Sequence, residues 1–266
     1  MRLEFLIIDP QNDFSDTPDA ALPVPGASAD AERLAQLLNR LGNRIAEIHV
    51  TLDTHQWVDI AHPVFWRDGA GGQPVPFTQI TVADVENQVW QPFRPEHRHR
   101  ALDYVRALRD HGRYTLTIWP PHCLVGTWGH GVIPVVAEAL RRWEEAGFAR
   151  VDYVTKGHNP WTEHYSAVQA DVPDPADPRT QLNTHLIRTL EQADWVVLSG
   201  QALSHCVANT VRDIADDFGP ESVRKLVLIE DASSPVPGFE DLARQFLRDM
   251  KQRGMKTAKA AEFLHR

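Results

Sequence analysis

Apolar residues along this 266-residue chain gather in short runs that alternate with stretches of helical period. Six runs rich in Val, Ile, Leu and aromatic residues predict β-strands, and several are apolar throughout, as strands buried on both faces are. These runs are residues 3–8, 45–52, 114–119, 151–155, 195–199 and 225–229. Strands that alternate with helices predict an α/β protein, a three-layer α/β/α fold with a central six-stranded, mainly parallel sheet.

The predicted helices lie between these runs, where apolar residues recur at positions i, i+3, i+4 and i+7. In the first of them, the apolar positions between residues 34 and 41 are followed by Gly42, and glycine is common just beyond a helix end. Comparable patterns lie at residues 102–108, 136–143, 182–190, 207–218 and 242–250.

One segment, at about residues 63–100, interrupts the alternation. It contains most of the Gly and Pro turn signals and has no strong periodicity, so we expect a single domain over residues 1–266 with an insertion there. The GAGG stretch at residues 69–72 is not a dinucleotide-binding loop, because it follows no predicted strand and Pro74 stands where the third glycine is needed. We therefore expect no nucleotide cofactor.

Charge and composition restrict the partners. The net charge of −9 disfavours nucleic acid and anionic membrane surfaces, which would repel the chain. No apolar stretch is long enough to span a membrane, and the N-terminus lacks the features of a signal peptide. Two cysteines cannot form a disulfide scaffold. These features predict a soluble, cytoplasmic protein.

Reactive side chains follow the predicted strands at their carboxyl ends, which is where ligands bind in open α/β sheets. Alone, each of them could be an ordinary capping or packing residue, but their shared position predicts one site. They are Asp9 after the first strand, Asp53 and His55 after the second, His122 after the third, Lys156 after the fourth and Cys206 beyond the fifth.

Two kinds of chemistry are suggested by these residue types. Cys206 begins a predicted helix, whose free N–H groups and dipole favour an anion and would lower a thiol pKa. Most free cysteines are simply small buried apolar residues, so the partners of Cys206 decide between the two interpretations. Asp53, His55 and His62 form a D-x-H-x6-H pattern, and together with His122 they suit a divalent ion such as Zn, Fe or Mn.

Five motifs, in order along the chain, resemble those of the isochorismatase-like cysteine hydrolases, and among them the nicotinamidases. WPPHCLVGTWG resembles the nicotinamidase branch more than the isochorismatase branch. The motifs are LIIDPQNDF (6–14), TLDTH (51–55), WPPHCLVGTWG (119–129), VTKGHNP (154–160) and SGQALSHCVANT (199–210).

The resemblance implies a role for residues in each motif. The implied catalytic triad is Asp9, Lys156 and Cys206, and the implied ligands of one divalent metal are Asp53, His55 and His122, with His62 at the position of a further ligand in some members. A cis peptide bond would fall at Gln201–Ala202, and the N–H groups of Ala202 and Cys206 would form the oxyanion hole. Phe14, Trp119 and Gln201 would contact the substrate.

The function implied by the resemblance is hydrolysis of nicotinamide to nicotinate and ammonia through a cysteine thioester. Three departures leave the substrate open: a long segment between His62 and His122, Gln201 in place of an apolar residue, and Ser204 in place of an Asp. The alternatives are an isochorismatase-like vinyl-ether hydrolase, an amidase for another small amide, and a non-catalytic binding protein of the same fold. The resemblance also suggests a homo-oligomer. The sequence does not specify the metal or what it would do.

Overall fold

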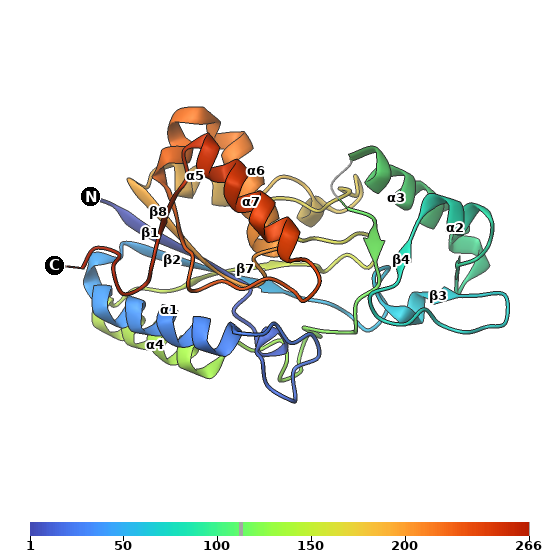
Figure 1. Cartoon of the computed structure of the whole chain (residues 1–266), viewed down its shortest axis with the longest axis horizontal. Helices are drawn as coiled ribbons and strands as arrows, with labels where there is room; N and C mark the ends of the chain where they lie inside the picture. Colours follow the sequence, from blue (N-terminus) through green and yellow to red (C-terminus); the bar gives the residue numbers. More distant parts are fainter. Residues whose placement is uncertain (112–113, 266) are drawn as a thin grey trace.

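A computed structural model describes residues 1–111 and 114–265 and contains one central sheet of six strands, all parallel (Figure 1). The order across the sheet is β10-β9-β8-β1-β2-β7. The strands are β1 (Leu3–Ile8), β2 (Glu47–Asp53), β7 (Asp152–Lys156), β8 (Trp195–Gly200), β9 (Leu226–Ile229) and β10 (Lys256–Ala258).

Helices cover both faces of the sheet, which confirms the predicted three-layer α/β/α fold (Figure 1). Alternate residues of β1 point to opposite faces: Phe5 and Ile7 pack on one side with α1 and α4, and Leu6 and Ile8 on the other with α5, α6 and α7. The helices are α1 (Ala27–Leu41), α4 (Pro134–Gly147), α5 (Thr184–Glu191), α6 (Cys206–Ser222) and α7 (Glu240–Arg253).

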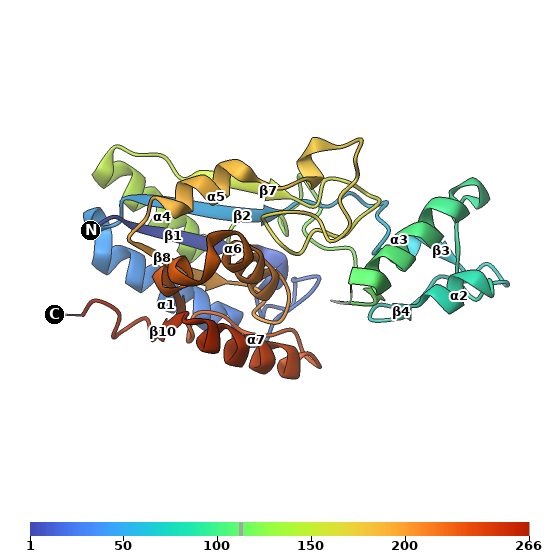
Figure 2. The ribbon, with the colours of Figure 1, turned by 90° about the horizontal axis from the view of Figure 1, so that it is seen from above.

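Most of the chain between β2 and α4 forms a side arm that extends past the carboxyl ends of the strands (Figures 1 and 2). It contains two antiparallel pairs, β3 with β5 and β4 with β6. Its elements are β3 (Trp66–Arg67), β4 (Gln79–Ile80), α2 (Val82–Glu86), β5 (Gln91–Pro92), α3 (Arg98–His111) and β6 (Leu116–Thr117). Short 3₁₀ turns complete the chain at Asn12–Phe14, Gly42–Arg44, Pro63–Phe65, Pro95–His97, Pro178–Thr180 and Val223–Lys225.

One of the six predicted strands is wrong. Of residues 114–119 only Leu116–Thr117 are extended as a strand, and they pair with β4 in the side arm, outside the central sheet. The apolar run is buried there among arm residues, and burial alone does not say in which sheet a strand lies. The sixth strand is instead β10, a three-residue edge strand that contains no apolar run. No helix in the described ranges is both long and apolar enough to cross a membrane.

Candidate active site

The site lies at the carboxyl ends of β1 and β8, which are neighbours in the sheet. Gly200 closes β8 with a φ of +118°, and a Cβ at this position would lie 1.9 Å from the carbonyl oxygen of Ile8. Only glycine permits this approach. The next peptide bond, Gln201–Ala202, is cis, as the family resemblance implied. The chain then turns so that Cys206 is the first residue of α6.

Lys156, at the end of β7, is the centre of the buried charged group. Its Nζ atom lies 2.9 Å from Oδ2 of Asp9, 3.0 Å from Oδ1 of Asp53 and 3.6 Å from Sγ of Cys206. A carboxylate oxygen of Asp9 lies within 4.8 Å of the Cys206 sulfur. Thr51 Oγ1 donates a hydrogen bond to the Asp9 carboxylate and so fixes it from behind. The structure therefore brings Asp9, Lys156 and Cys206 together, as the sequence predicted.

Burial controls the protonation of these three groups. It raises the pKa of Asp9 although Lys156 opposes it, and it raises the pKa of the Cys206 thiol well above its usual value. The expected lowering of the thiol pKa by the helix start is therefore wrong, because the loss of solvation outweighs it. Burial also disfavours the charged form of Lys156, but Asp53 and Asp9 outweigh it and hold its pKa well above the ordinary range.

Two backbone N–H groups near the start of α6 have no acceptor in the described part of the chain. Ala202 follows the cis bond, and Cys206 is the first residue of a helix, where N–H groups have no partner within the helix. Within the ranges that the structure describes, neither the N–H of Ala202 nor that of Cys206 has an acceptor. Free backbone donors near a nucleophile can stabilise an oxyanion.

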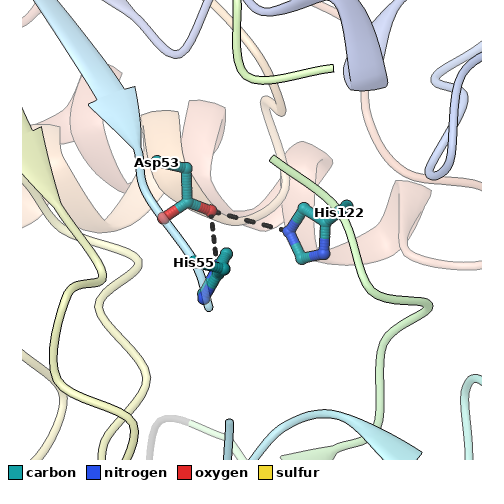
Figure 3. Close-up of side chains that lie close together, drawn as sticks. All are labelled: Asp53, His55 and His122. Atoms are coloured by element: carbon teal, nitrogen blue, oxygen red, sulfur yellow. Dashed lines mark hydrogen bonds and ion pairs between the residues drawn. The ribbon is translucent and has the colours of Figure 1, made fainter. Parts of the chain in front are cut away.

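A group of metal-ligand side chains adjoins Lys156 (Figure 3). The Nε2 atoms of His55 and His122 lie 3.1 and 3.6 Å from Oδ2 of Asp53, and all three side chains are buried. Asp59 Oδ2 lies 3.2 Å from Nδ1 of His55, and the carbonyl oxygen of Pro120 lies 2.9 Å from Nδ1 of His122. These contacts hold each ring by its Nδ1 atom and turn both Nε2 atoms toward Asp53, which is how histidine ligands are usually oriented.

The His62 ring lies next to this group. Its ring centroid lies 5.3 Å from that of His55 and 5.9 Å from that of His122. Its Nδ1 atom lies 3.2 Å from the carbonyl oxygen of Trp57, and its buried Nε2 atom has no hydrogen-bond partner in the described part of the chain. Burial lowers the pKa of His62 to about 4, so the ring is neutral near pH 7. Three imidazoles and one carboxylate fit a divalent metal of the Zn, Fe or Mn type.

The three predicted substrate contacts lie in different surroundings. The Phe14 ring contacts that of His122, with centroids 5.5 Å apart. Trp119 is buried and donates a hydrogen bond from Nε1 to the hydroxyl of Tyr165, so part of it packs as core. The Gln201 side chain contacts two protein groups, Oδ2 of Asp30 at 2.9 Å and the N–H of Ser234 at 3.2 Å. A substrate contact by the Gln201 side chain stays a prediction.

Sequence reasoning missed the residues that hold the site from behind. Gln11 donates to the carbonyl oxygen of Asp53 at 2.8 Å and accepts from its N–H at 2.7 Å, which clamps β1 to the end of β2. Asp59 and Thr51 orient His55 and Asp9. Gln11 and Thr51 lie within the quoted motifs, and Asp59 lies four residues after His55, but polar residues at such positions are too common to be singled out.

Comparison with known protein families and with curated proteins finds no match to this chain, but solved structures match it over nearly the whole length. The yeast nicotinamidase Pnc1p bound to nicotinaldehyde aligns with a TM-score of 0.67 and 18% identity, covering 97% of this chain and 99% of that one. A nicotinamidase/pyrazinamidase from Acinetobacter baumanii aligns with a TM-score of 0.63 and 21% identity, covering 99% of this chain and 98% of that one. The Pyrococcus horikoshii pyrazinamidase in complex with zinc aligns with a TM-score of 0.58 and 19% identity, covering 97% of this chain and 99% of that one.

These matches identify the fold. The chain has the isochorismatase-like α/β fold of nicotinamidase and pyrazinamidase structures, as the resemblance of its motifs implied. At 18–21% identity the likeness extends no further than the fold. The chemistry of this chain has to be argued from its own residues.

Proposed function

We propose that the protein is a metal-containing cysteine amidohydrolase that converts nicotinamide, or a close analogue, to the carboxylic acid and ammonia. The observation that carries the proposal is the buried contact of Lys156 with Asp9, Asp53 and Cys206. Cys206 begins α6, and the N–H groups of Ala202 and Cys206 have no acceptor among the described residues. A thiol that only fills space needs neither a buried cation nor a carboxylate within reach.

In the first half of the reaction, Asp9 accepts the proton of the Cys206 thiol and the sulfur attacks the carboxamide carbon. Burial raises the pKa of Asp9, which makes its carboxylate a stronger base for this proton than an ordinary aspartate. Lys156 remains protonated and stabilises the thiolate. The N–H groups of Ala202 and Cys206 bind the developing oxyanion, a contribution of about 3–4 kcal/mol for a good donor.

In the second half, Asp9 returns the proton to the leaving nitrogen, ammonia departs and a thioester of Cys206 remains. Asp9 then accepts a proton from water, whose oxygen attacks the thioester carbon. The carbon–sulfur bond breaks, Asp9 returns the proton to the sulfur, and the acid and the Cys206 thiol are released. A divalent metal held by Asp53, His55, His122 and His62 would supply a Lewis acid that polarises water or binds a ring nitrogen of the substrate.

Nicotinamide is the favoured substrate for two reasons. Phe14 lies against the metal-ligand residue His122, so a flat aromatic ring bound near the metal would meet an aromatic face. The structural neighbours include proteins described as bound to nicotinaldehyde and to nicotinate, which are pyridines substituted with a one-carbon carbonyl group.

The test is steady-state ammonia release from nicotinamide and from a panel of aliphatic amides. We expect nicotinamide to be hydrolysed with the highest kcat/KM, Cys206→Ala to be inactive, and Cys123→Ala, the matched control at the other buried cysteine, to stay within a few-fold of the natural chain. Nicotinaldehyde should inhibit, because the thiol can add to its carbonyl and no group can leave. Activity retained in Cys206→Ala would refute the cysteine mechanism, and equal rates on aliphatic amides would refute the substrate.

The metal is tested separately by elemental analysis. His122→Ala should bind one divalent ion fewer per chain than the natural protein, whereas His99→Ala, an exposed histidine in α3, should bind the same number. An unchanged metal content in His122→Ala would exclude the proposed ligand set.

A further inference from the structure

A second group of ionisable side chains lies at the amino end of the sheet, at the opposite end of the strands from the candidate active site. It comprises Glu4 of β1, Glu47 and His49 of β2, and Asp152 of β7. Glu4 pairs in register with Glu47, and His49 pairs with Asp152. Because residues two apart in a strand share a face, the sheet places all four on one face.

Arg2 accounts for only part of the charge in this group. Its Nε atom lies 2.5 Å from Oε1 of Glu4, and its Nη2 atom lies 2.5 Å from Oε1 of Glu47. The second oxygen of each carboxylate faces His49, with Nε2–Oε2 distances of 3.6 Å to Glu4 and 3.8 Å to Glu47. Both distances are too long for hydrogen bonds.

Two of these inward-facing atoms are deeply buried and unsatisfied. In the described part of the chain, Nε2 of His49 and Oε2 of Glu4 have no hydrogen-bond partner, and the two side chains are only 3% and 0% exposed. Such atoms are rare in native proteins, because a buried polar atom without a partner is costly, and a bound ion is one way to satisfy them. The three atoms that Glu4, Glu47 and His49 offer lie within 4.8 Å of one another.

The spacing is that of a metal tripod. Ligands about 2.0–2.2 Å from a tetrahedral Zn²⁺ stand about 3.3–3.5 Å apart, so small side-chain movements would close this group on an ion. Asp152 Oδ2 lies 2.8 Å from Nδ1 of His49, which completes the carboxylate–histidine–metal arrangement found behind many ligands. Arg2 holds the two glutamates in a comparable way through their outer oxygens.

We propose that Glu4, Glu47 and His49 form a second divalent-metal site, with Zn²⁺ as the ion that one imidazole and two carboxylates suit. A surface cavity of about 640 Å³ adjoins the group and is lined in part by Glu47, His49 and Asp152. The site would bind β1 to β2 at their amino ends and serve stability. It is independent of the proposed amidohydrolase reaction.

A proton is the competing occupant. Burial disfavours the imidazolium of His49, but Glu4 and Asp152 outweigh it and raise the pKa of His49. A metal binds the neutral imidazole, so binding should strengthen as the pH rises.

The experiment uses the full chain with His122→Ala, so that the candidate active-site metal is weakened, stripped with a chelator and dialysed against Zn²⁺ at pH 8. Elemental analysis should find about one Zn²⁺ per chain, and Zn²⁺ should raise the Tm. Adding Glu47→Gln should weaken binding by at least about tenfold and remove most of the Tm rise. Glu47 is suitable because its side chain is 42% exposed, so folding does not depend on it.

A second variant and a control keep the result interpretable. Asp152→Asn should weaken Zn²⁺ binding by about 10–100-fold through the orientation of His49. Glu145→Gln, an exposed carboxylate of α4, should bind as tightly as the parent. The proposal is overturned if the His122→Ala chain binds no Zn²⁺, or if its Zn²⁺ affinity is unchanged by both Glu47→Gln and Asp152→Asn. A failure of the amidohydrolase proposal would change ammonia release and leave these results as they are.

Discussion

Replacing Lys156 with methionine would remove the only cation that contacts both Asp9 and Asp53 among the described residues. The side chain is 1% exposed, and methionine keeps most of its apolar volume, so the change is mainly one of charge. Asp9, Asp53 and Lys156 together have a formal charge of −1, and without the lysine this becomes −2 in a buried site.

The expected cost follows from that burial. Removing one partner of a buried ion pair typically costs about 3–5 kcal/mol, because the remaining charge stays buried and uncompensated. The free energy of unfolding of a native protein is about 5–15 kcal/mol, so a loss of this size should be easy to measure. The sign of its pH dependence also follows. Asp9 already has a raised pKa, and without Lys156 that pKa rises further, so protonation at lower pH relieves the repulsion and the cost shrinks.

The assay is guanidinium unfolding of chelator-treated protein at pH 6 and pH 8. Lys251→Met, which removes an exposed lysine 3.5 Å from Glu230, is the control and should cost no more than about 1 kcal/mol. The double variant Asp9→Asn/Lys156→Met should be more stable than the sum of its single changes by at least about 1 kcal/mol, since it restores the charge of −1. A Lys156→Met cost below about 1 kcal/mol, or additive single changes, would refute the electrostatic account.

Three further predictions concern other parts of the molecule. Gly157→Ala should weaken metal binding in a metal titration, because φ of Gly157 is +80° and a Cβ there would lie 2.7 Å from Oδ1 of the proposed ligand Asp53. Gly69→Ala, where a Cβ would meet open space, is the control and should bind metal as tightly as the natural chain. Because the pKa of His49 is raised in the folded state, its protonation stabilises the fold fully below about pH 6.5, and this stabilisation is lost as the pH rises through the folded-state pKa. In metal-free protein, the free energy of unfolding of His49→Gln should therefore lose this pH dependence, measured by denaturant unfolding between about pH 6 and 9. Trp119→Phe should cost about 1–3 kcal/mol in denaturant unfolding if the Tyr165 hydroxyl loses its donor, and an unchanged midpoint would show that this bond is worth little.

Much of the fold could be predicted because it rests on local patterns. The run at residues 3–8 is apolar throughout and is a strand buried on both faces, and the spacing of leucines between residues 34 and 41 is the core-facing side of α1. The run at residues 114–119 misled because burial and β-propensity do not specify a partner strand. β10 could not be found because a short edge strand needs few apolar contacts; parallel pairing with β9 makes it a strand.

The sequence by itself determined which residues could do chemistry and that they would meet. Strands of a parallel sheet end on one side, so Asp9, Asp53, Lys156 and Cys206 had to share an edge once β1, β2, β7 and β8 were recognised. Only the tertiary structure decided protonation and orientation. Desolvation depends on what covers a side chain, and it reversed the expected direction of the Cys206 pKa. Two other features likewise depend on register and packing between segments far apart in sequence, which a linear pattern does not encode. They are the contacts of Gln201 with Asp30 and Ser234, and the group formed by Glu4, Glu47 and His49.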